Sequence, residues 1–264
     1  RDCLLSRGLG DVYKRQMNRA FNSLKTFYHK LGSSPWFYRI SGITIPYVAL
    51  FSFLFLSIGI VWGVFFSPTD FKQGDVYRII YMHVPAASVS QSIYYTMTVA
   101  AVVSMIWRMK MAGIFIKSMA PIGASFTFLA LISGSIWGQP TWGTWWIWDA
   151  RLTSTLVLFI FYIAIISLYS SFSEKKSADQ AVSILTLVGA VNLPIIKKSV
   201  DWWNTLHQPA SIKFTESSSI SPEMLYPLII SIFGFYLVVL LSGLMAMRAE
   251  IAKREINKEW FKNY

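Results

Sequence analysis

Apolar residues in this chain fall in long blocks rather than at alternate positions. Six blocks approach the roughly 20 residues that a helix rising about 1.5 Å per residue needs to cross the hydrocarbon of a bilayer. Because backbone groups in lipid must pair within the chain, the pattern predicts an all-α polytopic membrane protein. The six predicted transmembrane helices cover residues 45–66, 84–107, 114–137, 152–169, 181–196 and 225–247.

The fifth block is the shortest, and Asn192 and Pro194 interrupt its end. Proline removes a backbone donor and disfavours a continuous helix. We therefore expect this helix to give way to a structured loop here. The Asn192 side chain would then bond backbone groups that the helix no longer pairs.

Composition supports a membrane protein and narrows its chemistry. Of the 264 residues, 54% are hydrophobic and only 14% are charged, whereas a soluble domain carries about a quarter charged residues. A single cysteine, Cys3, excludes an intramolecular disulfide and any multi-cysteine metal site. Residues 1–16 begin without Met and resemble translated sequencing-adapter read-through, so we expect the native start at Met17, the alternative being a disordered native tail.

The net charge of +11 is distributed unevenly between the two predicted sides of the membrane. From Met17 onward, 14 Lys and Arg residues fall on the side of both termini and 6 on the other. The positive-inside rule therefore predicts that both termini are cytoplasmic, and it explains the basic charge without nucleic-acid binding. We expect a basic interfacial segment at residues 17–44, a membrane domain at 45–247 and a charged cytoplasmic tail at 248–264.

Two of the three histidines, His83 and His207, fall at the predicted outer face, whereas His29 lies in the basic segment. Taken singly, each is most simply a hydrogen-bonded residue of a helix interface. Together they suit the axial positions of a haem iron, for which neutral imidazoles are good ligands. Zinc is a weaker candidate, because no cysteine, third outer histidine or carboxylate cluster completes a tetrahedral set.

Tryptophans concentrate on the same side, around the stretch "QPTWGTWWIWDARLTS" (residues 139–154). An aromatic belt would divide more evenly between the two faces, so the excess indicates a platform for a flat apolar ligand. If the run is helical, Trp142, Trp145 and Trp146 share one face. The seven tryptophans on or beside the outer loops are Trp137, Trp142, Trp145, Trp146, Trp148, Trp202 and Trp203.

Three charged residues flank these aromatic and imidazole groups. Asp149 has three open roles: it caps the next helix, orients a ligating histidine or places Arg151. Arg78 and Arg151 are the outer-side arginines. Either they clamp the propionates of a haem, since guanidinium suits carboxylates, or they are surface charges that extend to lipid headgroups.

The tryptophan-rich stretch resembles the WGxxWxWD segment of the haem-handling membrane proteins of cytochrome c biogenesis. The fixed positions of that segment correspond to Trp142, Gly143, Trp146, Trp148 and Asp149. With "MHVPAA", "NLPIIKKSVDWWNTLHQPAS" and six predicted spans, the chain is similar to the short haem exporter C family from about residue 40 to residue 247.

The resemblance implies a site for haem b at the outer face of the bacterial inner membrane. His83 and His207 would be the axial ligands of the iron, and Trp137 and the Trp142–Trp148 segment would cradle the ring. The haem would pass to a periplasmic haem chaperone. The implied partners are an ATP-binding cassette ATPase, its membrane subunit and a small single-span protein. The protein would not be an enzyme, and it has no G-x-x-x-x-G-K-[ST] loop for ATP.

Two other functions compete with haem delivery. A transporter subunit that itself translocates haem is disfavoured because the predicted helices carry few ionisable residues, Lys117 being the main one. A membrane electron-transfer cytochrome would place histidine pairs near both faces, whereas here only the outer face has them.

Overall fold

The computed structural model describes residues 26, 29–30, 32–203, 205–207 and 220–264, and residues 1–16 therefore lie outside the described part. The regular elements in this part are helices, which confirms the all-α prediction. Six stretches are long and apolar enough to cross a membrane, as predicted. The elements are α2 (Ser34–Val61), η1 (Trp62–Phe66), η2 (Asp75–Ile79), α3 (Ile80–Trp107), α4 (Lys110–Trp142), α5 (Ala150–Ser170), α6 (Lys175–Gly189), α7 (Asn192–Trp202), α8 (Pro222–Glu255) and α9 (Glu259–Lys262).

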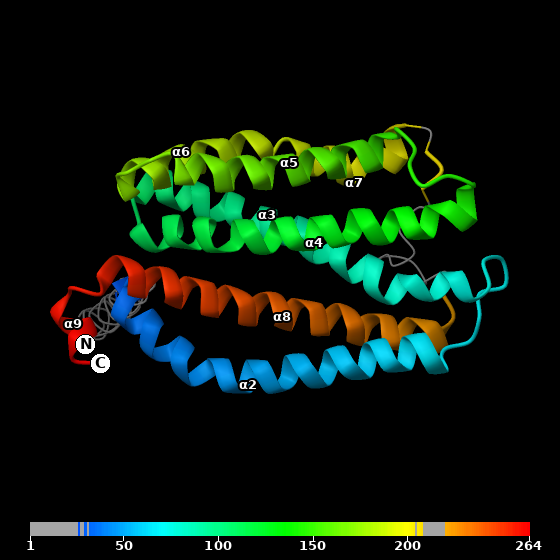
Figure 1. Cartoon of the computed structure of the whole chain (residues 1–264), viewed down its shortest axis with the longest axis horizontal. Helices are drawn as coiled ribbons and strands as arrows, with labels where there is room; N and C mark the ends of the chain where they lie inside the picture. The colour runs from blue at the N-terminus through cyan, green and yellow to red at the C-terminus, as the bar shows by residue number, and fades with distance from the viewer. Residues whose placement is uncertain (1–25, 27–28, 31, 204, 208–219) are drawn as a thin grey trace, which may run out of the picture.

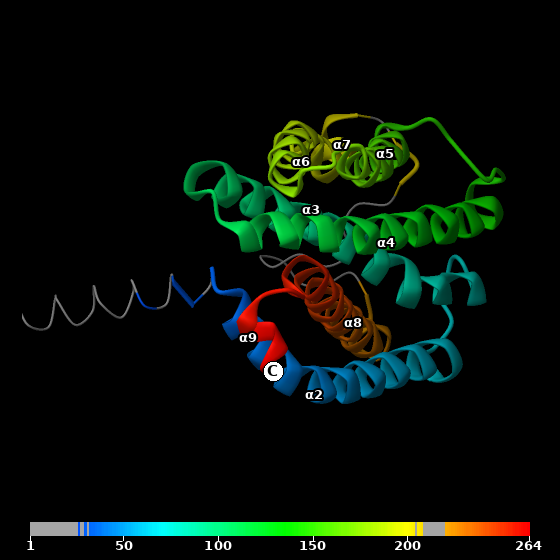
Figure 2. The ribbon, with the colours of Figure 1, turned by 60° about the vertical axis from the view of Figure 1, so that its left-hand side comes forward.

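The helices form three layers (Figures 1 and 2). Helices α2 and α8 pack against each other in one outer layer, α3 and α4 form the middle layer, and α5, α6 and α7 form the other outer layer. The beginning of α2 and the C-terminus lie at the same end of the bundle, as an even number of crossings requires (Figure 1). The side of the membrane that this end faces remains a prediction from the charge distribution.

Helix ends follow local capping rather than the limits of the apolar blocks. Ser33 accepts a hydrogen bond from the Trp36 backbone at 3.4 Å and starts α2, well before residue 45. Helix α8 continues to Glu255, beyond Met247, where the predicted span ends. Backbone pairing extends a helix until a cap stops it, whatever the polarity of the side chains. The helices are therefore longer than the hydropathy pattern indicates.

The expectation of a loop after Asn192 is wrong. The fifth crossing breaks earlier, at residues 190–191, and α7 then runs from Asn192 through Trp202. Pro194 lies in the first turn of α7, where a missing N–H removes no helical hydrogen bond. The Asn192 side chain donates instead to the backbone oxygen of Ser154 in α5, at 2.8 Å.

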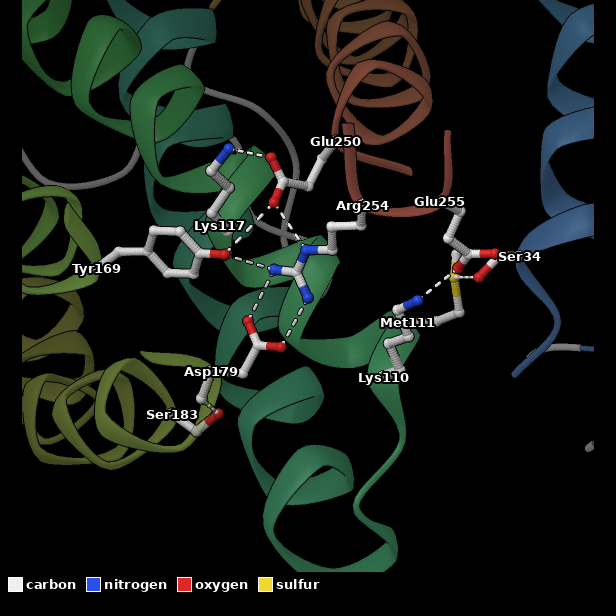
Figure 3. A network of polar contacts seen from close by, with 10 residues as sticks. All are labelled: Ser34, Lys110, Met111, Lys117, Tyr169, Asp179, Ser183, Glu250, Arg254 and Glu255. Carbon is white, nitrogen blue, oxygen red and sulfur yellow. Dashed lines mark hydrogen bonds and ion pairs between the residues drawn. The ribbon is translucent and has the colours of Figure 1, made fainter. Parts of the chain in front are cut away.

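An ionic cluster joins the layers at the end of the bundle that carries the C-terminus (Figure 3). Arg254 of α8 makes two parallel bonds of 2.8 and 2.9 Å with Asp179 of α6, and a third of 2.7 Å with Glu250. Lys117 of α4 pairs with the other Glu250 oxygen, and Tyr169 of α5 accepts from Arg254 at 2.6 Å. The ionic cluster, defined as Lys117, Tyr169, Asp179, Glu250 and Arg254, thus connects four helices.

Candidate functional site

A cavity of about 670 Å³ lies at the opposite end of the bundle from the ionic cluster. Its walls come from α3, α4, α5, α7 and the beginning of α8, together with the segments that connect them. Its volume falls within the range of roughly 300–1,000 Å³ that is usual for small-molecule sites. Six of the residues singled out from the sequence line it: His83, His207, Trp137, Trp142, Trp146 and Arg151.

His83 lies in the first turn of α3, and its ring is oriented by Ser133 of α4. The His83 Nδ1 atom is 3.1 Å from the Ser133 hydroxyl, which donates its own proton to the Leu129 backbone oxygen at 2.7 Å. With the Ser133 proton given to Leu129, we assign Ser133 as the acceptor and Nδ1–H as the donor of this bond. This assigns the other ring nitrogen, Nε2, as the one with a lone pair, the form in which histidine binds a metal.

Two further contacts fix the His83 ring in place. It lies so close to Gly134 that a Cβ atom there would be 2.9 Å from His83 Cε1. On another side it meets the Trp137 ring edge-on, with 5.6 Å between ring centroids. Trp137 is itself held by its indole N–H, which donates to the Gln73 side chain at 2.7 Å. The ring is thus positioned by α4 and by the segment that precedes η2.

His207 is positioned through a chain of hydrogen bonds that begins at Asp149. One Asp149 carboxylate oxygen accepts from the Leu152 backbone at 2.7 Å and caps α5. The other accepts from the Thr205 hydroxyl, which in turn accepts from the His207 backbone N–H at 3.0 Å. Of the three roles open for Asp149, the structure thus shows the cap and a link to His207. Asp149 itself does not line the cavity.

The tryptophan-rich segment is not helical beyond Trp142, so the condition for a shared helical face of Trp142, Trp145 and Trp146 is not met. Helix α4 ends at Trp142 because Gly143 adopts a left-handed conformation, with φ of 79°. Such a backbone favours glycine and ends a helix. Trp142 packs near His207, with ring centroids 6.2 Å apart. Gly143 therefore turns the chain at the cavity rather than lining it.

The remaining indoles of this segment divide into one that faces the cavity and two that do not. Trp146 lines the cavity, and its indole N–H is buried with no hydrogen-bond partner in the described part of the chain. Trp145 and Trp148 are 61% and 77% exposed and are not in the cavity wall. Trp148 instead meets Trp146 edge-on at 5.5 Å. Trp202 and Trp203 are also exposed.

The two outer-side arginines have different surroundings. Arg151 lines the cavity and donates to the Ser199 hydroxyl at 3.3 Å and the Ile196 oxygen at 3.4 Å, both in α7. Arg78 is not in the cavity wall; its guanidinium pairs with Asp75 at 2.8 Å and donates to the Val64 oxygen at 2.6 Å. The geometry therefore brings Arg151, but not Arg78, to the histidines.

Charge along the cavity wall is one-sided. Apart from the histidines, the ionisable residues among the described wall residues are Lys72 and Arg151, both cationic. Nowhere in the described ranges do three or more His, Cys, Asp or Glu side chains gather where they could hold a metal ion. Two histidines suffice, however, for a metal that brings its own equatorial ligands. The cavity thus suits a flat, anionic, metal-containing ligand.

A family model and several known proteins match most of this chain. The family model described as Heme exporter protein C matches residues 27–262. The Heme exporter protein C of Escherichia coli strain K12 is 50% identical over 88% of this chain and 94% of its own length. The proteins of that name from Haemophilus influenzae and Bradyrhizobium diazoefficiens are 48% and 43% identical, over 85% and 83% of this chain and 92% and 83% of their own lengths.

Proposed function

Because the chain belongs to the Heme exporter protein C family, which handles haem in cytochrome c maturation, we propose that its cavity binds haem b and presents it for delivery to a periplasmic haem chaperone. The observation that carries the proposal is that His83 and His207 line one cavity although 124 positions separate them in the sequence. In this proposal they supply the two axial ligands of the iron.

The other wall residues fit the remaining parts of a haem. Trp137, Trp142 and Trp146 offer apolar faces and edges suited to a macrocycle. The buried Trp146 N–H, which has no partner in the described protein, can donate to a carboxylate. Lys72 and Arg151 add positive charge, which favours the carboxylates of the haem propionates. Arg78 can contribute at most to the surrounding field, because its guanidinium is engaged elsewhere.

Delivery requires that the site face the periplasm and that partners reach it. The excess of Lys and Arg at the opposite side supports this orientation in the bacterial inner membrane. The exposed Trp145 and Trp148 beside the cavity leave an apolar surface for the chaperone. We propose that the ATPase, its membrane subunit and the single-span protein act as partners, and that this chain binds and orients haem without catalysis.

The decisive experiment removes both proposed ligands at once. In the double variant His83→Ala/His207→Ala, purified protein should lose the Soret absorbance of bis-histidine haem. His29→Ala, which removes the histidine outside the cavity, should retain it. Transfer of haem from the wild type to purified chaperone would then be followed by the same spectrum. Full haem content in the double variant would contradict the ligand assignment, whereas haem binding without transfer would contradict only the delivery step.

A further inference from the structure

Two serines of α3 lie on the helix stripe that faces the bilayer. The most exposed residues of the middle of α3, including Tyr95, Val99 and Val102, recur every three or four positions and form one stripe of a helix. Ser88 and Ser92 continue this stripe toward the cavity end of the bundle. Both serines are half-buried, and α3 is long and apolar enough to span the membrane, so this stripe is the part of α3 that would border the hydrocarbon.

A tyrosine of α8 meets the two serines from the neighbouring helix. Tyr236 is 38% exposed and belongs to a similar stripe on α8 that includes Tyr226, Ile229 and Phe233. Its hydroxyl is hydrogen-bonded to Ser88 at 3.1 Å and to Ser92 at 2.5 Å. These three residues form a hydroxyl bridge across the α3–α8 contact, on the lipid-facing surface of the protein.

The hydroxyl bridge also adjoins the cavity. Ser88 lines the cavity wall, and so do His83, Val84, Ala87 and Gln91 of the same helix. On α8, Leu228 belongs to the wall. The same side chain, Ser88, thus faces the cavity and is bonded to a lipid-facing residue. The hydroxyl bridge therefore lies at the α3–α8 contact, between a residue of the cavity wall and a partly exposed residue of α8.

Such a bridge is suited to opening and closing. Polar groups at a lipid-facing surface are costly unless they bond one another, so mutual pairing favours the closed contact. Individual interhelical hydrogen bonds in membranes are nevertheless weak. Nothing covalent or ionic holds α3 to α8 at Tyr236 among the described contacts, in contrast to the ion pairs that hold α8 near its other end.

From this geometry we infer that haem enters the cavity sideways from the bilayer, between α3 and α8, with the hydroxyl bridge closing the passage behind it. The inference rests on the proposed haem-binding function and adds the source of the ligand. Haem is flat and largely apolar, so it partitions into hydrocarbon, and after passing between α3 and α8 it would enter a cavity whose α3 wall includes Ser88, Gln91 and His83.

The test compares two sources of haem for one reconstituted protein. Apo-protein in liposomes is loaded either from haem already dissolved in the bilayer or from a water-soluble haem donor added outside. In a Cys3→Ser background, Ser92→Cys and Tyr236→Cys introduce two thiols, and neither position lines the cavity. A short bifunctional thiol reagent, cleavable by reductant, then joins α3 to α8. Each single-cysteine variant treated with the same reagent is the matched control.

The expected result is selective. Crosslinking should slow the appearance of the bis-histidine Soret band from bilayer haem by about tenfold or more, leave loading from the soluble donor unchanged, and be reversed on cleavage. Equal slowing of both sources, or of neither, would overturn lateral access while the haem site stands. Failure of the uncrosslinked protein to take up haem from either source would instead overturn the proposed function.

A milder variant tests the hydroxyl bridge itself. Tyr236→Phe keeps the ring and removes the hydroxyl, so bilayer loading should be faster by about three- to tenfold, as expected for the loss of one or two interhelical hydrogen bonds. Tyr95→Phe removes another lipid-facing hydroxyl from the exposed stripe of α3 and should change nothing. A Tyr236→Phe rate equal to the wild-type rate would exclude the hydroxyl bridge as the closing contact.

Discussion

The two ends of the helix bundle both hold polar groups, but they satisfy them differently. In the ionic cluster, the side chains of Arg254 and Glu250 are only 6% and 3% exposed, and every charge meets an opposite one within the protein (Figure 3). In the cavity, Lys72 and Arg151 face a wall that contributes no carboxylate among its described residues. The buried N–H of Trp146 likewise finds no partner in the described protein.

The difference separates groups that complete the fold from groups that await a ligand. Buried charges that are paired and hydrogen-bonded are tolerated, and breaking one such pair is strongly destabilising. A buried donor without a partner, and cations to which the cavity wall offers no carboxylate, have their counterpart in what the cavity binds. We therefore expect substitutions in the ionic cluster to lower the stability of the fold and substitutions in the cavity to lower the affinity for haem. Each kind of substitution should have little influence on the other property.

The largest effect is expected from Arg254→Ala, which leaves Asp179 and Glu250 without their shared cation. The free energy of unfolding in detergent should fall by about 3–5 kcal/mol, because Asp179 would remain a buried charge without a cation and Glu250 would keep only Lys117. Lys198→Ala, which breaks an exposed pair with Asp201 at 3.0 Å, should cost at most about 1 kcal/mol. The fraction of the Arg254→Ala variant that is still folded should bind haem with wild-type affinity. Loss of haem binding at unchanged stability would contradict the assignment of the ionic cluster to the stability of the fold.

Two glycines in α4 allow the cavity and the packed core to be compared within one helix. Gly134→Ala would press on the His83 ring, and Gly123→Ala would press on the buried Tyr162 ring. Overpacking costs about 1–3 kcal/mol. For Gly134→Ala we expect this cost chiefly in haem binding, measured by spectroscopic titration. For Gly123→Ala we expect it in thermal unfolding of the apo-protein. Identical profiles for the two variants would show that the site and the core are not separable.

Much of the fold was predictable from the sequence because each span carries its own signal. Hydropathy located six crossings, and they are confirmed. It did not locate helix ends, because caps such as Ser33 and Asp149 act through single hydrogen bonds. Pro194 was misinterpreted because proline interrupts a helix interior but is compatible with a first turn, and only the break at residues 190–191 distinguishes the two.

The candidate site was predictable only for residue types that stand out. Histidines and tryptophans are rare beside apolar blocks, so the sequence identifies His83, His207 and the indoles as candidate site residues. Sequence reasoning missed the residues that position them, Gln73, Ser133 and Thr205, because hydroxyls and amides are common and their partners lie far away in the chain. Ser133 and Gly134 did leave a weak signal, as part of a run of three small residues, Ser133 to Ser135, in an otherwise apolar stretch.

The smallest effect concerns Ser133, which acts on the ligand rather than on the cavity. Ser133→Ala removes the acceptor of the His83 Nδ1–H, so the ring can rotate and Nε2 becomes a weaker donor. Haem affinity should fall by about tenfold, the lower end of the effect of such supporting groups, and the reduction potential of the bound haem should shift. Ser118→Ala, which deletes a buried α4 hydroxyl without a partner in the described protein, is the matched control. A structural role for Ser133 would change stability but not the potential, whereas a positioning role changes the potential at unaltered stability.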